Sequence, residues 1–93
     1  MSFTKESATD IARRDLAARL GVSESDVEVS AVNDREFPDM SLGAPANGEA
    51  SAQMISDGWQ IRLKGSGKEY EYRADKYQIR LVGFEGSNHL IKG

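Results

Sequence analysis

Apolar and polar side chains alternate most regularly between Gly58 and Arg73. Apolar residues occupy every second position on both sides of a glycine-rich segment at 65–67. A period of two is what a half-buried strand requires, and a glycine-rich break between two such runs favours a tight turn. The stretch therefore predicts a β-hairpin whose turn takes its positive φ angles from Gly65 and Gly67. Its apolar face is expected to consist of Trp59, Ile61, Leu63, Tyr70 and Tyr72.

A longer period, of three to four residues, runs from Thr4 to Leu20 and predicts an amphipathic helix. The apolar side of this helix carries Ala8, Ile11, Ala12, Leu16 and Leu20. The hydroxyl of Ser2 or Thr4 is placed to cap the first turn, and Gly21 is placed to end the helix in a left-handed conformation.

Three further runs predict strands. The first begins at Val27, carries a bulge near Val32 and ends before Pro38, because proline cannot donate a hydrogen bond to a sheet. The other two runs are 50–55 and 77–82. Together with the hairpin they indicate an α+β fold, in which one N-terminal helix packs on a four- or five-stranded antiparallel sheet.

A chain of 93 residues is long enough for one core. We expect a single domain over residues 1–83 and a flexible C-terminal tail over 84–93, where glycines accompany little pattern. The expected core consists of the inward apolar positions of the helix and strands. These are Ile11, Leu16, Leu20, Val27, Val29, Trp59, Ile61, Leu63, Tyr70, Tyr72, Ile79 and Leu81, with Tyr77 also facing inward.

The segment 38–50 has no usable periodicity and contains two prolines and two glycines. A loop of this length in a small domain is often functional or mobile, so it is the first place to look for a site. The candidate partner-binding residues in it are Asp39, Met40, Leu42 and Glu49. The carboxylates of Asp39, Glu49 and Asp57 do not fit the spacing of a calcium loop. We therefore expect Asp39 to bind turn amides, Glu49 to be exposed, and no metal or other cofactor.

The net charge of −3 is unevenly distributed. Residues 1–61 contain five basic and eleven acidic side chains, whereas residues 62–80 contain six basic and three acidic ones. The outer face of the hairpin region is therefore a candidate anion-binding face, formed by Arg62, Lys64, Arg73 and Arg80. A solvated surface of mixed charge is the more ordinary interpretation. Nucleic acid is not the expected partner, because an acidic chain neutralises few phosphates.

Little in the sequence supports catalysis, and we do not expect an enzyme. The chain has no cysteine, and its single histidine, His89, lies in the glycine-containing tail. The Gly-Ser-Gly-Lys segment at 65–68 lacks the spacing of a phosphate-binding loop. No apolar stretch approaches the roughly 20 residues of a membrane span, and the start of the chain lacks the features of a secretory signal. We therefore expect a cytoplasmic location.

Short motifs occur along the chain in a fixed order. They are Leu20-Gly21-Val22, Asp39, Leu42-Gly43, Glu49, Gln53, Gly58-Trp59-Gln60-Ile61-Arg62-Leu63 and Tyr72-Arg73-Ala74-Asp75. Through these motifs the stretch from Asp26 to Leu81 resembles a family of small uncharacterised bacterial domains that is frequent in cyanobacteria. The resemblance implies one helix over an antiparallel sheet, and it implies no activity.

The chain departs from the pattern of that family at three positions. Phe37 stands where the family has tryptophan, and Ser41 and Ser51 stand at two cysteine positions. In exported relatives the resemblance implies a disulfide that closes the long loop. The absence of both cysteines is what a reducing compartment would allow, and without the disulfide we expect a looser loop in this chain than in those relatives.

Two hypotheses about function remain. The first is a noncatalytic, monomeric module that binds an unknown protein or peptide through the 38–50 loop or through an edge strand at 50–55 or 77–82. The second is weak binding of an anion or nucleic acid through the basic outer face. We favour the first by analogy of fold with cystatins and peptidase propeptides, which are small helix-on-sheet domains that bind proteins.

Overall fold

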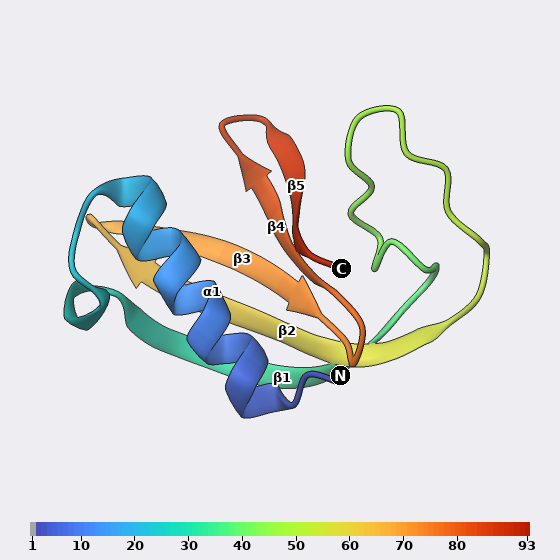
Figure 1. The fold of residues 1–93 in the computed structure, drawn as a ribbon, viewed down its shortest axis with the longest axis horizontal. Coiled ribbons are helices and arrows are strands. Elements are labelled where there is room, and N and C mark those ends of the chain that lie inside the picture. The colour runs from blue at the N-terminus through green and yellow to red at the C-terminus, as the bar shows by residue number, and fades with distance from the viewer. Residues whose placement is uncertain (1) are drawn as a thin grey trace.

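The computed structural model describes residues 2–93, which form one helix packed on a five-stranded sheet (Figure 1). The helical elements are α1 (Lys5–Leu20) and the short 3₁₀ turn η1 (Glu24–Asp26). The strands are β1 (Glu28–Phe37), β2 (Ser56–Gly65), β3 (Lys68–Ala74), β4 (Ile79–Phe84) and β5 (Ser87–Lys92). Neighbouring strands are antiparallel, and their order in the sheet is their order in the sequence. The predicted α+β fold is confirmed.

The helix begins and ends where the sequence predicts. The Thr4 hydroxyl accepts a hydrogen bond from the Ser7 amide at 3.0 Å, and the Ser7 hydroxyl accepts one from the Thr4 amide at 2.9 Å. This reciprocal pair satisfies two backbone amides at the start of α1. At the other end Gly21 adopts a left-handed φ of 69°, and its amide donates to the Ala17 carbonyl.

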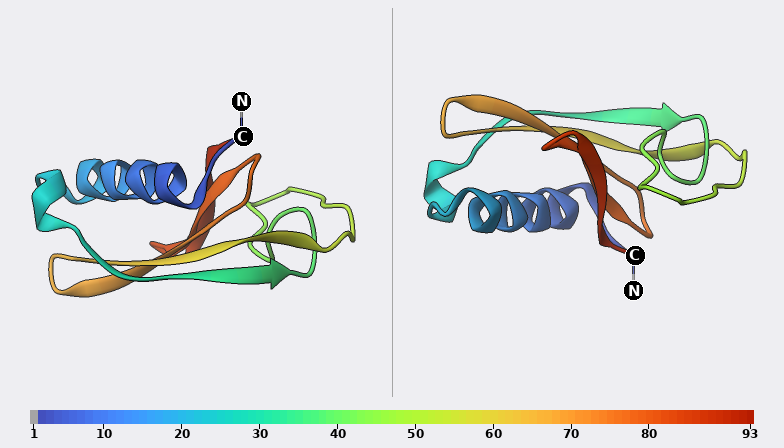
Figure 2. Two further views of the ribbon diagram at one scale, coloured as in Figure 1. Left: turned by 90° about the horizontal axis from the view of Figure 1, so that it is seen from below. Right: turned by 90° about the horizontal axis from the view of Figure 1, so that it is seen from above.

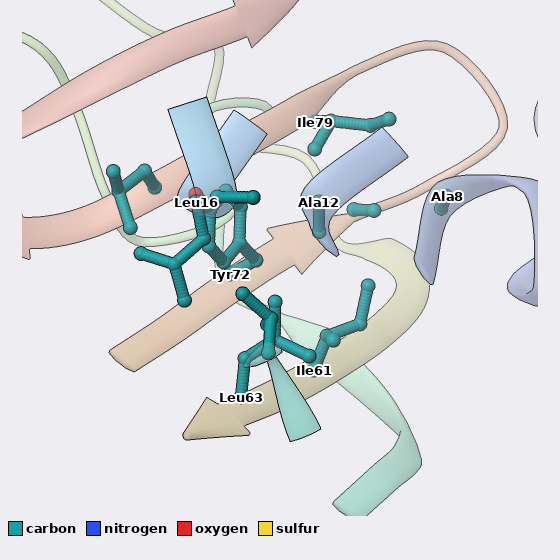
Figure 3. Packing of buried hydrophobic residues seen from close by; sticks show 11 residues of the cluster. Ala8, Ala12, Leu16, Ile61, Leu63, Tyr72 and Ile79 are labelled. Atoms are coloured by element: carbon teal, nitrogen blue, oxygen red, sulfur yellow. The ribbon is translucent and has the colours of Figure 1, made fainter. Parts of the chain in front are cut away.

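The main core lies between α1 and one face of the sheet (Figure 2). Ala8 and Ala12 are fully buried, which lets the helix approach the sheet closely, and Leu16 packs near Tyr72 (Figure 3). The buried cluster is Ala8, Ala12, Leu16, Ala17, Val27, Ile61, Leu63, Tyr72, Ala74, Ile79 and Leu81. The other predicted core residues pack partly buried against this cluster, except Val29 and Tyr77. These partly buried residues are Ile11, Leu20, Trp59 and Tyr70.

One polar contact connects α1 to the centre of the sheet. The Tyr72 hydroxyl donates a hydrogen bond to Asp15 Oδ2 at 2.7 Å, and Arg19 Nε donates to the same oxygen at 2.8 Å. Burial, together with the hydrogen bond to Asp15, raises the pKa of Tyr72 above its ordinary value. The hydroxyl therefore stays protonated and donates to the helix across the physiological pH range.

The central hairpin is confirmed, with one change in its turn. Strands β2 and β3 pair from Gly65 opposite Lys68 at the turn to Trp59 opposite Ala74. The positive φ angles belong to Ser66, at 50°, and Gly67, at 79°, so the prediction for Gly65 is wrong. Gly65 is needed for another reason: a Cβ there would lie 2.8 Å from Leu20 Cδ1, because β2 passes close to the end of α1.

A β-bulge interrupts β1, as predicted, although it lies slightly earlier in the chain. The pairing with β2 shifts between Val29 and Ala31. Val29, predicted to be buried, is 41% exposed. A bulge bends the strand and increases its twist, which turns the residue beside it away from the regular core face.

Two predictions about the extent of the sheet are wrong. Residues 50–55 form no strand and belong instead to the long loop between β1 and β2. The tail predicted to be flexible contains β5, which pairs with β4 across a two-residue turn at Glu85 and Gly86, with φ of 52° and 82°. Strand β4 is therefore an inner strand, and the stretch 77–82 offers no free edge.

The close approach of β2 and β3 can be tested at Gly58. A Cβ on this residue would lie 2.1 Å from the Ala74 carbonyl oxygen. We expect Gly58→Ala to lower the free energy of unfolding by about 3 kcal/mol, because the two strands must separate to admit a methyl group. Urea denaturation measures the loss.

A matched control is Gly21→Ala, where no atom lies within 4 Å of the added Cβ and only the left-handed φ is strained. We expect this variant to lose about 1 kcal/mol. Equal losses in the two variants would contradict the close approach at Gly58.

Candidate partner-binding site

The loop between β1 and β2, residues 38–55, packs at one end of the sheet, where β3 ends and β4 begins, against side chains that alternate with those of the core under α1. Figure 1 shows α1 and this loop on opposite sides of the β4–β5 hairpin. Phe37, Leu42 and Ala44 are almost completely buried, with 1%, 0% and 1% exposure, yet none belongs to the core under α1. They mark a second, smaller core. Sequence reasoning missed it because the loop has no periodic pattern.

Asp39 shapes the first turn of the loop. Its Oδ1 accepts hydrogen bonds from the Ser41 hydroxyl at 2.6 Å, the Ser41 amide at 2.9 Å and the Gly43 amide at 3.0 Å. The Ser41 hydroxyl, followed by the Gly43 amide, holds the pKa of Asp39 below its ordinary value. The prediction that Asp39 binds turn amides is confirmed. The turn also holds Leu42 at a φ of 58°, a conformation that is costly for a branched residue and that burial of its side chain offsets.

Arg80 of β4 is the main anchor of the loop. Its side chain is 4% exposed and pairs in bidentate fashion with Glu49, at 2.5 Å for Nη1–Oε1 and 2.8 Å for Nη2–Oε2. The guanidinium also donates to Gln78 Oε1 at 2.7 Å and to the Ala44 carbonyl at 3.2 Å. Hydrogen bonding from Arg80 lowers the pKa of Glu49 to about 2. Glu49 lies at the surface, as predicted, but its carboxylate is paired with Arg80.

Two more side chains bind carbonyl groups of the loop. Arg73 Nη1 donates to the Leu42 carbonyl at 2.8 Å, and Gln78 Nε2 donates to the Met40 carbonyl at 2.6 Å. A backbone segment pressed against a sheet would otherwise bury these acceptors without partners. The loop is therefore held to the sheet at several points along its length.

These contacts divide the candidate anion-binding face. Arg73 and Arg80 have side chains only 15% and 4% exposed, and both hold the loop. Arg62 and Lys64 remain on the surface of β2. The four cations therefore do not form one accessible basic surface, because the loop covers the part nearest β4.

A surface hollow of about 310 Å³ opens where the loop returns to the sheet. We call it the methionine hollow, and it is lined by Met40, Met54, Ile55, Ser56, Asp57, Asp75, Lys76 and Tyr77. Met54 is 62% exposed, and Ile55 and Tyr77 are each 69% exposed. Large apolar side chains therefore surround the hollow and face solvent.

Local hydrogen bonds fix the walls of the methionine hollow. The Met40 amide donates to the Ala52 carbonyl at 3.0 Å, which holds the two arms of the loop together. On the opposite wall, Asp75 Oδ1 accepts the amides of Tyr77 at 2.8 Å and Gln78 at 3.0 Å and so defines the turn between β3 and β4.

A second hollow, of about 480 Å³, lies beside the first. We call it the tryptophan hollow, and it is lined by Asp34, Arg35, Glu36, Asp57, Gly58, Trp59 and Lys76. Asp57 and Lys76 line both hollows, so the two are neighbours. Trp59 is half-buried and serves both as part of the core and as a wall of this hollow.

The sequence identified only part of this site. Of the four candidate loop residues, Met40 lines the methionine hollow, Leu42 is buried in the second core, and Asp39 and Glu49 hold the loop. Met54 and Ile55 were missed as wall residues because their segment was predicted to be a strand. Tyr77 faces solvent and not the core.

Two further structural findings concern residues 2–93 only. They contain no group of three or more His, Cys, Asp or Glu side chains placed to hold a metal ion. No helix in this part of the chain has the length and apolar character needed to cross a lipid bilayer.

Removal of the Arg80 guanidinium should detach the loop. We expect Arg80→Met to lower the free energy of unfolding by about 2 to 4 kcal/mol and to open residues 38–55 to proteolysis, because Glu49 and two further acceptors lose their partner. The exposed Arg62, 3.9 Å from Glu69, provides the control, and Arg62→Met should cost less than about 1 kcal/mol. A loop equally resistant to protease in both variants would contradict the anchoring role.

The pairing also predicts a dependence on pH. The folded pKa of Glu49 lies near 2, below its ordinary value of 4.5. Its contribution to stability is therefore complete above pH 4.5 and is lost as the pH falls from 4.5 toward 2. We expect Glu49→Gln to be less stable than the original chain at pH 7 and the difference to shrink across this range. Denaturation curves at several pH values measure it, and a constant difference would exclude the pairing.

Comparison with known proteins adds one finding. Residues 9–82 match the sequence model of a domain of unknown function, DUF8738. None of the curated proteins and none of the solved structures matches the chain. The match agrees with the expected resemblance to an uncharacterised family, while the bacterial origin and the particular residue pattern stay predictions.

Proposed function

Because this chain belongs to the DUF8738 family of domains of unknown function, we propose a function from its own surface: a noncatalytic module that binds a partner protein at the methionine hollow. The observation that carries the proposal is the clustering of exposed apolar side chains. Six large apolar residues among 2–93 are exposed, and four of them line this one hollow. Single exposed apolar residues are ordinary, whereas a cluster around a concavity is typical of a protein-binding surface.

The chemistry of the walls fits this role. Methionine is flexible and polarisable, so Met40 and Met54 can adapt to the side chain of a partner. Tyr77 offers a large apolar ring with a hydroxyl at its end, a combination that is common at the centres of protein interfaces. The turn of Asp75 and the anchored loop hold these side chains in place before binding, which lowers the entropic cost of association.

The other proposed modes have less support. Binding to the edge of 50–55 or 77–82 does not fit the sheet, because the first segment is a loop and the second is mostly an inner strand. Weak anion or nucleic-acid binding would depend on Arg62 and Lys64, since Arg73 and Arg80 hold the loop. The proposal includes no reaction and no cofactor. It takes the partner to be a protein, and it takes the chain to act as a monomer in the cytoplasm.

Site-specific photocrosslinking tests the proposal. A benzophenone amino acid placed at Ile55 in cells of the source organism should crosslink to one defined protein. The same group at Lys68, an exposed position at the start of β3 and remote from the hollow, is the control and should not capture that protein.

A second variant tests whether the crosslink depends on the side chains of the methionine hollow. Tyr77→Ser, combined with the group at Ile55, should reduce the yield roughly tenfold through loss of apolar contact area. Because Tyr77 is 69% exposed, this change should leave the melting temperature nearly unchanged. Equal crosslinking at Ile55 and Lys68, or no crosslink at Ile55, would contradict the proposal.

A further inference from the structure

We propose that the segment bound at the methionine hollow carries a basic side chain, and that this side chain enters the neighbouring tryptophan hollow. The inference rests on the proposed function and names the chemistry of its partner. It commits to one occupant: a peptide segment of another protein in which an arginine or lysine stands close to an apolar residue.

The pairing of β1 with β2 explains the composition of the tryptophan hollow. Asp34 lies opposite Trp59, and Glu36 lies opposite Asp57. Because side chains two residues apart on a strand share a face, these four side chains project from the same side of the sheet, the side that α1 covers farther along. The result is an indole ring among three carboxylates.

Two of the three carboxylates of this hollow have no ion-pair partner among residues 2–93. Asp34 pairs with Lys5 at 2.8 Å. Glu36 and Asp57 lie directly opposite each other and form no ion pair within 4.0 Å among the described residues. Like charges at opposed positions destabilise a sheet. A cation bound between the two carboxylates would relieve that repulsion.

The basic residues of the hollow do not supply this cation. Arg35 alternates to the other face, where its guanidinium lies 5.3 Å from the centre of the Phe37 ring and 3.9 Å from Glu71. Lys76 lines the hollow but makes no ion pair within 4.0 Å among the described residues. Lys76 therefore leaves Glu36 and Asp57 without a bound cation in this structure.

Trp59 adds a second attraction for a basic side chain. The face of an indole ring carries partial negative charge and attracts ammonium and guanidinium groups more strongly than other aromatic rings do. The half-buried ring and the adjacent carboxylates thus favour the same ligand. An acidic segment would meet Asp34, Glu36 and Asp57, and a purely apolar one would leave these carboxylates near an apolar surface.

The arrangement of the two hollows determines how the segment lies. Asp57 and Lys76 form the boundary between them, so one short segment can place an apolar side chain beside Met54 and Tyr77 and a basic side chain beside Trp59. Charge complementarity therefore selects the partner, and the apolar contact holds it.

NMR titration with defined peptides tests the inference. The chain has one tryptophan, so the indole NH of Trp59 gives a single resonance for the tryptophan hollow, and the methyl of Met54 reports on the methionine hollow. The probes are four capped tripeptides at millimolar concentration: Leu-Arg-Leu, Leu-citrulline-Leu, Leu-Glu-Leu and Gly-Arg-Gly.

Leu-Arg-Leu should shift both resonances, and its affinity should fall with added salt. Leu-citrulline-Leu, which has nearly the same shape without the charge, should bind about fivefold more weakly and leave Trp59 less affected. Leu-Glu-Leu should bind most weakly, and Gly-Arg-Gly should leave Met54 unaffected.

Variants of the protein give matched controls. Glu36→Gln with Asp57→Asn should remove the preference for arginine over citrulline, and Lys76→Gln should increase it. Glu69→Gln, at the far end of the hairpin, should leave the preference for arginine over citrulline unchanged. Glu36 and Asp57 are both exposed, so the double variant should remain folded, which the dispersion of its amide spectrum checks.

The outcomes separate the two proposals. If citrulline and arginine peptides bind equally and shift Met54, the basic partner is excluded and the protein-binding function stands. If only Trp59 responds, and Gly-Arg-Gly binds as well as Leu-Arg-Leu, a cation site exists without the apolar contact that the inference requires. If no peptide shifts either resonance, the inference is overturned, and photocrosslinking at Ile55 decides separately whether the methionine hollow binds a protein.

Discussion

The buried guanidinium of Arg80 connects the two halves of this molecule. Strand β4 contributes Ile79 and Leu81 to the core under α1, while Arg80 between them points to the loop on the other face. A buried charge is costly without close partners, and here Glu49, Gln78 and a loop carbonyl provide them. The loop cannot leave the sheet without depriving this charge of its partners, so its position is coupled to the formation of β4.

This anchoring turns a segment of irregular sequence into a defined surface. Met54 and Ile55 have no place in either core, yet the loop holds them beside Tyr77, which belongs to the turn between β3 and β4. A freely moving loop would have to be ordered during binding at an entropic cost. Here the loop becomes ordered when the protein folds, and the hydrogen bonds to its carbonyl groups keep it ordered.

In the tryptophan hollow, two like charges lie opposite each other on neighbouring strands. The opposed carboxylates of Glu36 and Asp57 reduce stability locally, although a single substitution would remove the repulsion. Local features that oppose stability are typical of surfaces with a separate function. The position of Trp59, with part of its ring in the core, couples this hollow to the stable part of the fold.

Residue periodicity alone determined α1 and the central hairpin, because each depends on contacts between neighbours in sequence or across a two-residue turn. It also identified most of the core residues, because inward positions recur with the period of each helix or strand. Strand β5 was missed, although Glu85-Gly86 could have indicated its turn. Only the tertiary structure decided the role of the loop. Arg80 and Glu49 are 31 residues apart, and sequence cannot show whether an arginine faces solvent or a distant carboxylate. The two hollows likewise combine residues from β1, the loop and the β3–β4 turn, so they exist only once the sheet has formed.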